Sequence, residues 1–244
     1  MENKIRIKWF DVLDSTNDEL LRHLPDYDNL SVVAAVDQFA GRGQRGNRWL
    51  SHPGDNLTFS LLLKPSDLPA KAFMSITFLS TLVVRDWLRR EGVPAVIKWP
   101  NDIYAGNRKI CGMLIENGLD RDRIAWSVIG IGLNLNQVRF PGELMNPTSL
   151  KRLTGKDYDP ASCLEAICRL FESRLPELES GRDRLHAAYN EELFQKDRVC
   201  SYRDIGSGSV FEGMIKGVSP EGRLMMEQGG IIRSFAFKEL GYIL

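Results

Sequence analysis

The chain has 244 residues, of which 43% are hydrophobic and 26% are charged, which is enough for one or two globular domains with a buried core. Lysine plus arginine and aspartate plus glutamate each number 32, so the formal net charge is zero. A protein that binds nucleic acid usually carries a basic excess, so this balance disfavours that class while leaving room for a local basic patch.

Targeting and redox signals are absent from the sequence. The N-terminus, MENKIRIKWFD, has no apolar run followed by a small-residue cleavage site, and no stretch reaches the roughly 20 apolar residues that span a bilayer. The four cysteines show no CxxC pair and no histidine at metal-ligand spacing. We therefore expect reduced thiols, a cytoplasmic location and no membrane partner.

Strand and helix patterns alternate along most of the chain. Residues 31–36 form a continuous apolar run typical of a strand buried on both faces. Residues 70–91 show helical spacing of apolar residues, and Gly92 is a natural stop. A polar turn at 117–123 predicts an antiparallel hairpin. Strands are expected at 5–10, 31–36, 56–64, 96–99, 109–116 and 124–133, and helices at 19–24, 70–91, 160–178 and 182–194.

The pattern changes after Lys196. Short apolar runs at 210–218, 223–227 and 231–237 alternate with glycine-rich turns, which is typical of a small β-barrel. We therefore predict two domains, residues 1–195 and 196–244. The larger one mixes helices with a mixed or antiparallel sheet, so its class is α+β.

Two clusters of polar residues precede the long helix. Ser15, Thr16 and Asn17 stand where side chains cap a helix start, and they are also able to hold a small polar ligand. The stretch GRGQRGNRW, Gly41 to Trp49, combines glycines that permit close backbone approach with arginines that pair with phosphate or carboxylate. It is neither a dinucleotide-binding fingerprint nor a P-loop, and alone it is compatible with a flexible basic loop.

Two further clusters lie near strand ends. KWPND, residues 98–102, is followed by KICGMLIE, residues 109–116, so that two lysines and an aspartate stand where they could serve an anion and its magnesium. Taken structurally, the same residues are a solvated strand and a turn after proline. GIGLNLN, residues 130–136, places glycines inside a strand, which marks either close approach of another group or a β-bulge.

In this order the clusters resemble one family. DSTN, Q-x-x-GRG-x-x-G-x-x-W, KWPND, K-x-x-G-x-x-x-E and G-x-G-x-N resemble the motifs of the biotin protein ligases, or biotin–[acetyl-CoA-carboxylase] ligases. The resemblance runs from about Trp9 to Asn136, and the C-terminal strands resemble that family's SH3-like domain. It implies that biotin and ATP form biotinyl-5′-adenylate, and that a lysine of a biotin carboxyl carrier domain then takes the biotin.

The resemblance also assigns roles to matching positions. Biotin binding is implied for Ser15, Thr16, Asn17, Gln38, Gly41, Arg42, Lys109 and Gly112. Binding of ATP or the adenylate is implied for Arg42, Gly43, Gln44, Arg45, Arg48, Trp49, Asn101, Lys109 and Asn134. Catalysis is implied for Lys109, Arg42 and Asp102, with Asp102 orienting Mg²⁺ or the incoming lysine. No covalent nucleophile is expected, because positioning and electrostatics suffice for joining two anions.

The chain departs from the family pattern at one residue and lacks one feature. Gln44 stands where many relatives carry arginine, and the sequence leaves open whether Arg45 or Arg48 replaces it or whether the adenylate is held less tightly. The motifs begin almost at once, so we expect no N-terminal DNA-binding domain and no repressor function.

Three alternatives stay open on sequence alone. A lipoate ligase or lipoyl/octanoyl transferase shares the catalytic fold. A nucleic-acid-binding module could use the Gly-Arg loop and the C-terminal barrel. A biotin-sequestering protein could have lost turnover. The sequence does not identify the carrier protein that is modified, and it leaves the oligomeric state, including a homodimer, undecided.

Overall fold

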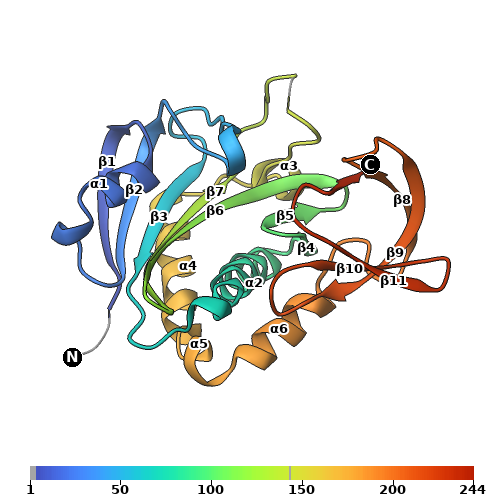
Figure 1. The fold of residues 1–244 in the computed structure, drawn as a ribbon. Coiled ribbons are helices and arrows are strands. Elements are labelled where there is room, and N and C mark those ends of the chain that lie inside the picture. Colours follow the sequence, from blue (N-terminus) through green and yellow to red (C-terminus); the bar gives the residue numbers. More distant parts are fainter. Residues whose placement is uncertain (1–3, 143) are drawn as a thin grey trace.

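The computed structural model describes residues 4–142 and 144–244, without the side chain of Arg45. A seven-stranded sheet forms its centre, in the order β1-β2-β3-β7-β6-β5-β4 (Figure 1). Only the β1–β2 pair is parallel, so the sheet is mixed, as predicted. The strands are β1 (Arg6–Leu13), β2 (Ser31–Gln38), β3 (Leu57–Leu63), β4 (Ala95–Lys98), β5 (Asp102–Ala105), β6 (Arg108–Asp120) and β7 (Arg123–Leu133).

Helices cover both faces of this sheet. On one face Leu20 of α1 (Thr16–Arg22) packs with Val33 and Leu62, whereas the neighbouring Val32 and Leu61 join the main core under α2 (Met74–Arg90). This alternation explains why the predicted strand at 31–36 is a continuous apolar run. The other helices are α3 (Leu150–Thr154), α4 (Pro160–Arg174), α5 (Glu177–Ser180) and α6 (Arg182–Glu191), with 3₁₀ turns η1 (Leu24–Asp26), η2 (Gln44–Gly46) and η3 (Ala70–Ala72).

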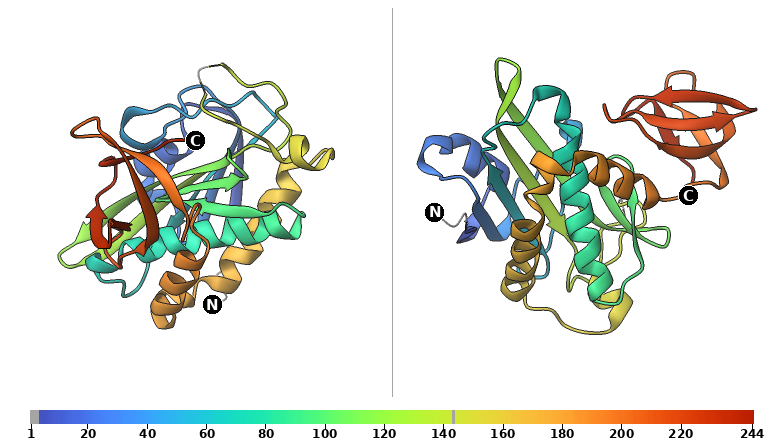
Figure 2. Two further views of the ribbon diagram at one scale, coloured as in Figure 1. Left: turned by 90° about the vertical axis from the view of Figure 1, so that its right-hand side faces the viewer. Right: turned by 90° about the horizontal axis from the view of Figure 1, so that it is seen from below.

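A second, antiparallel sheet follows α6, in the order β11-β10-β9-β8-β12 (Figure 2). Trp99 joins it to the first sheet, because its indole nitrogen Nε1 donates to the carbonyl oxygen of Gly222 at 3.0 Å. Helix α6 ends eight residues before the second sheet begins, and a domain boundary at residue 195 stays a prediction. The strands are β8 (Val199–Asp204), β9 (Val210–Val218), β10 (Leu224–Gln228), β11 (Ile231–Phe235) and β12 (Leu240–Tyr242).

The sequence interpretation was wrong at short elements and at one turn. The four-residue strand β5 and the five-residue helix α3 were missed, because neither is long enough to show periodicity. Pairing with β4 on one side and β6 on the other holds β5 in place. The expected turn at 117–123 is mostly strand, and the chain reverses only at residues 121–122. Cross-strand pairing with β7 overrides the polar, glycine-containing sequence there.

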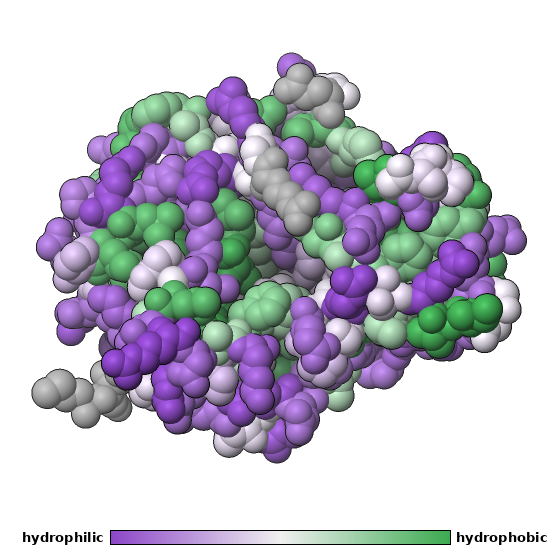
Figure 3. Space-filling model, viewed as in Figure 1, coloured by the Kyte–Doolittle hydropathy of each residue, from purple (hydrophilic) through white to green (hydrophobic). Residues whose placement is uncertain are grey.

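On the face shown in Figure 3, hydrophilic side chains dominate and smaller hydrophobic patches lie between them. Within the described ranges, no helix combines the length and the apolar character needed to cross a membrane.

Helix α6 also supports the β4–β5 turn. Tyr189 is completely buried, and its hydroxyl donates to the carbonyl oxygen of Pro100 at 2.7 Å. Replacing Tyr189 with phenylalanine would remove that donor and leave the Pro100 carbonyl unsatisfied. We expect Tyr189→Phe to lower the free energy of unfolding by about 1–2 kcal/mol, measured by urea denaturation.

The matched control is Tyr158→Phe, whose hydroxyl bonds to Thr154 at 3.0 Å in a partly exposed position. We expect a loss of about 0.5 kcal/mol or less for it. Equal losses for the two variants would contradict the role assigned to Tyr189.

Candidate active site

One cavity, of about 180 Å³, opens where the strand ends of the first sheet approach the second sheet. The start of α1, the loop after β2, the β4–β5 turn, and strands β6 and β7 line it, together with Phe237 from the C-terminal part. Segments that are far apart in sequence therefore share one hollow. The predicted site residues among its lining are Ser15, Thr16, Asn17, Gln38, Arg42, Gly43, Gln44, Arg48, Trp49, Asn101, Asp102, Lys109 and Gly112.

Two of the predicted residues that the structure describes, Asn134 and Gly41, do not line this cavity. Asn134 is buried, and its amide donates to the carbonyl oxygen of Thr148 at 2.9 Å, so it supports the segment before α3. Gly41 lies beside the cavity, where a Cβ would meet Trp49 O at 2.5 Å and Gln38 Nε2 at 2.7 Å. The side chain of Arg45 lies outside the described residues.

The start of α1 presents a hydrogen-bonded set of polar groups. The Ser15 hydroxyl caps the helix by accepting from the backbone of Asp18, so the capping interpretation holds. Gln38 Oε1 accepts from the backbone nitrogen of Thr16 at 2.8 Å and from its hydroxyl at 3.2 Å. The Ser60 hydroxyl of β3 donates to the Thr16 hydroxyl at 2.7 Å and holds it in place. Strands β2 and β3 therefore orient these side chains in the cavity wall.

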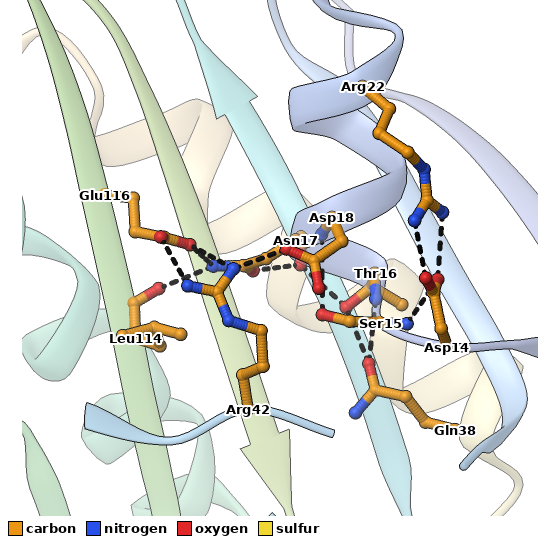
Figure 4. A network of polar contacts seen from close by, with 11 residues as sticks. Asp14, Ser15, Thr16, Asn17, Asp18, Arg22, Gln38, Arg42, Leu114 and Glu116 are labelled. Atoms are coloured by element: carbon orange, nitrogen blue, oxygen red, sulfur yellow. Dashed lines mark hydrogen bonds and ion pairs between the residues drawn. The ribbon is translucent and has the colours of Figure 1, made fainter. Parts of the chain in front are cut away.

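Arg42, in the loop after β2, connects that loop to α1 and to β6 (Figure 4). Its guanidinium donates to Glu116 of β6 at 2.8 Å and to Asp18 of α1 at 2.5 Å. Burial opposes its charge, but the bond to Glu116 and the charges of Glu116 and Asp18 raise the pKa of Arg42. Glu116 also accepts from the Asn17 amide at 2.8 Å. An anionic ligand at Arg42 would have to replace these carboxylates.

The Trp49 side chain packs against the backbone of strands β6 and β7 at glycine positions. Gly112 of β6 and Gly132 of β7 stand opposite each other in the ladder. A Cβ on Gly132 would come within 2.2 Å of Trp49 Cε2, and one on Gly112 within 2.9 Å of Lys109 Nζ. Gly130 similarly leaves room for Asn17, whose Oδ1 lies 2.2 Å from an ideal Cβ. The glycines were expected to admit a ligand or backbone, and side chains of this chain approach them instead.

The third cluster places opposite charges together. Lys109 Nζ lies 2.8 Å from Asp102 Oδ1, with both side chains partly exposed to the cavity. The ammonium also lies 5.6 Å from the centre of the Trp49 ring. Asn101 is buried and donates to the carbonyl oxygen of Met113, which ties the β4–β5 turn to β6.

Sequence comparison identifies the family that carries this arrangement. A profile described as the biotin/lipoate A/B protein ligase family matches residues 9–134, more than half of the chain. The chain belongs to this family. The match covers the start of α1, the Gly-Arg loop, KWPND and strands β6 and β7, so it contains nearly all of the cavity lining.

Individual relatives match a larger share of the chain than the family profile does. The bifunctional ligase/repressor BirA of Bacillus spizizenii is 32% identical over 216 residues, which are 84% of this chain and 64% of that protein. Biotin–[acetyl-CoA-carboxylase] ligase of Paracoccus denitrificans is 33% identical over 165 residues, 65% of this chain and 68% of that protein. The chain thus spans less than two thirds of the Bacillus relative.

A solved structure shows the same architecture throughout. Biotin protein ligase from Aquifex aeolicus in complex with biotin and ATP matches with a TM-score of 0.80 and 25% identity, covering 97% of each chain. The match includes both sheets, so the α+β fold with a small β domain, predicted from sequence, is confirmed.

The family resemblance missed several groups that line the cavity. Lys98, Trp99 and Pro100 belong to the KWPND motif, which was the available signal. Lys98 was expected only as one of two lysines able to serve an anion, and no role was assigned to Trp99 or Pro100. Glu116 does not line the cavity, but its carboxylate binds both Arg42 and Asn17, which do; in the sequence it was only the last residue of a motif. Phe237 lies in the turn between β11 and β12 of the second sheet, and no sequence pattern pointed to it as a site residue.

Cys111 is not available as a nucleophile in this family member. It is completely buried, and burial raises the pKa of its thiol well above the usual range, which disfavours the reactive thiolate.

The packing of Trp49 against these glycines can be tested by adding one methyl group. We expect Gly132→Ala to displace the Trp49 indole, because its Cβ would overlap Trp49 Cε2. The tryptophan emission assigned to Trp49, by difference from Trp49→Phe, should shift to longer wavelength. Gly142→Ala is the control, since a Cβ there has no neighbour within 4 Å among the residues that the structure describes. An unshifted Gly132→Ala spectrum would contradict this packing.

The Arg42 bridge can be tested by limited proteolysis. Glu116→Gln removes one of the two carboxylates that hold Arg42, so trypsin should cut the loop at 41–49 several-fold faster in the variant. The control is Glu165→Gln, which breaks the exposed Glu165–Arg169 pair within α4. Unchanged cleavage in Glu116→Gln would show that the bridge does not hold the loop.

Proposed function

We propose that the chain joins biotin to ATP to form biotinyl-5′-AMP and then transfers the biotin to a lysine of a biotin carboxyl carrier domain of the acetyl-CoA carboxylase type. One observation carries the proposal: Arg42 and Lys109 present their cations to the same cavity as the hydroxyl and amide groups at the start of α1. The Paracoccus relative bears the name of such a ligase, and the matched Aquifex structure holds biotin and ATP.

Substrate binding follows from the chemistry of the two ends of biotin. The head group is a neutral urea, which suits the hydroxyl and amide groups of Ser15, Thr16, Asn17 and Gln38. The carboxylate is an anion, which suits Arg42 once that residue releases Glu116. Gly112 allows Lys109 and Trp49 to lie close to β6, and Gly41 leaves room for the Gln38 amide. This assignment places the biotin carboxylate between Arg42 and Lys109.

The first chemical step joins two anions. A carboxylate oxygen of biotin attacks the α-phosphorus of ATP, the bond from that phosphorus to the bridging oxygen breaks, and pyrophosphate leaves. Lys109 and Arg42 stabilise the negative charge that builds up on the phosphate oxygens. Their role is electrostatic, since no covalent bond to the protein is needed.

The second step uses the activated anhydride. The neutral ε-amine of the carrier lysine attacks the acyl carbon, the bond between that carbon and the AMP oxygen breaks, and the amine gives up a proton. Asp102 lies beside Lys109 at the cavity and is the group assigned to orient the amine.

Magnesium fits the donor set as a companion of ATP. Within the described residues there is no group of three or more histidine, cysteine, aspartate or glutamate side chains able to hold a metal. Mg²⁺ commonly uses one carboxylate together with substrate phosphates. We assign Asp102 as the carboxylate that would hold Mg²⁺, and the bound Mg²⁺ would offset the negative charge of the phosphates.

The adenylate contacts are assigned to the loop that carries η2. Trp49, Gly43 and Asn101 line the cavity beside Lys109. Gln44 also lines it, and its Oε1 is buried without a hydrogen-bond partner among the described residues. Arg48 reaches the same cavity while donating to the Phe39 carbonyl at 3.2 Å, so we assign it the place of the missing family arginine.

The names of the relatives favour biotin over lipoate as the acid. The predicted absence of nucleic-acid binding, repressor function and a membrane partner stays a prediction. The same holds for cytoplasmic location and for the homodimer.

The decisive measurement is ATP–pyrophosphate exchange with each acid. We expect exchange with biotin and none with lipoate, followed by single-turnover transfer of biotin to a purified carrier domain. Exchange with lipoate alone would assign the chain to the lipoate branch. Binding of biotin without exchange or transfer would instead indicate a sequestering protein.

The role of Lys109 gives a quantitative test. We expect Lys109→Gln to lower the exchange rate by about 10²–10³-fold, the usual loss when a group that stabilises the transition state is removed. Lys151→Gln is the control, because Lys151 pairs with Asp157 on the surface of α3. A Lys109→Gln rate within about threefold of wild type would rule out an electrostatic role of this size.

A further inference from the structure

Lys98, at the end of β4, is a cation with an unusual environment. It lines the cavity and stands opposite Asp102 in the β4–β5 ladder. Asp102 is nevertheless paired with Lys109, at 2.8 Å. Among the residues that the structure describes, Lys98 has no ion pair within 4 Å and no hydrogen bond. Its ammonium instead faces the rings of Tyr104 and Tyr242, 5.1 Å and 4.5 Å from their centres.

This environment disfavours the charge of Lys98 when the cavity holds no anion. Burial lowers the pKa of Lys98, the nearby charge of Asp102 partly offsets this, and Lys109 lowers the pKa further. Two aromatic faces stabilise a cation only in part compared with a bonded anion. An anion entering the cavity would supply the missing partner.

Tyr242 belongs to β12 of the second sheet, and its hydroxyl has no role that the structure reveals. The hydroxyl is buried without a partner among the described residues. The ring packs on Tyr202 and Phe194, with centres 5.5 Å and 6.2 Å away. In Figure 1 the C-terminal end of the chain returns to the side of β5. The second sheet therefore sets the position of the ring that faces Lys98.

We propose that Lys98 is a further cation for the polyphosphate of ATP, and that Tyr242 is the residue of the second sheet that positions it. The inference rests on the function proposed above. As the bond from the α-phosphorus breaks, charge moves onto the pyrophosphate oxygens, and Lys98 stabilises that charge from the end of β4. The second sheet is thereby part of the adenylation site.

The first test uses Lys98→Met, which keeps an unbranched apolar side chain one atom shorter and removes the charge. In biotin-dependent ATP–pyrophosphate exchange, the KM for ATP and the inhibition constant of pyrophosphate should each rise about tenfold or more, as expected for a lost charged hydrogen bond. The Kd of biotin, measured by calorimetry without ATP, should stay within about twofold of wild type. The thermal midpoint of the free protein should not fall.

The second test separates the ring of Tyr242 from its hydroxyl. Tyr242→Leu should raise the KM for ATP several-fold. Tyr242→Phe should leave the KM for ATP at the wild-type value, because phenylalanine keeps the ring. Combined with Lys98→Met, Tyr242→Leu should add little further effect. Phe211→Leu is the matched control, since Phe211 packs on Tyr202 and Phe235 in the same sheet, away from Lys98.

The outcomes distinguish this inference from the function on which it rests. If the wild-type protein shows no biotin-dependent ATP–pyrophosphate exchange, the proposed function itself is contradicted. Normal wild-type exchange, with wild-type KM for ATP and wild-type pyrophosphate inhibition in Lys98→Met, would overturn the role of Lys98 alone. An equal rise in the KM for ATP in Phe211→Leu and Tyr242→Leu would overturn the positioning role of Tyr242.

Discussion

The close packing of Trp49 and Asn17 on bare backbone is the constraint on which the candidate site depends. Strands β6 and β7 carry glycine at facing positions, Gly112 and Gly132, so that an indole and a lysine ammonium lie directly on the sheet. A single Cβ at Gly132 would occupy the place of the Trp49 ring. Since Trp49 ends the Gly-Arg loop, the position of this loop over the cavity follows from the absence of side chains beneath it.

The site also explains how a chain without net charge is able to bind anions. Three of the described cations at the cavity have a bonded partner: Arg42 has Glu116 and Asp18, Lys109 has Asp102, and Arg48 has the Phe39 carbonyl. Lys98 faces two aromatic rings instead. The positive groups are therefore held in place before a ligand arrives, which reduces the reorganisation needed during reaction.

Contacts between the two sheets place the β4–β5 turn. Trp99 of this turn donates to Gly222, Tyr189 of α6 donates to Pro100, and Phe237 completes the cavity wall. The turn that presents Lys98 and Asp102 is thus held by groups that follow it by about ninety residues or more. Through these contacts the second sheet helps to position the residues of the candidate active site in the first sheet, in addition to any role in docking a carrier.

The sequence by itself determined the long elements, the α+β class and the order of motifs that marks the family, because these depend on local periodicity and on residue type. It did not reveal β5 or α3, which are held by neighbours more than by their own residues. Tertiary structure alone showed that the Asn134 amide bonds to Thr148 and that Tyr242 faces Lys98. Such contacts join residues distant along the chain, and local sequence patterns carry no information about which distant side chain will complete a site.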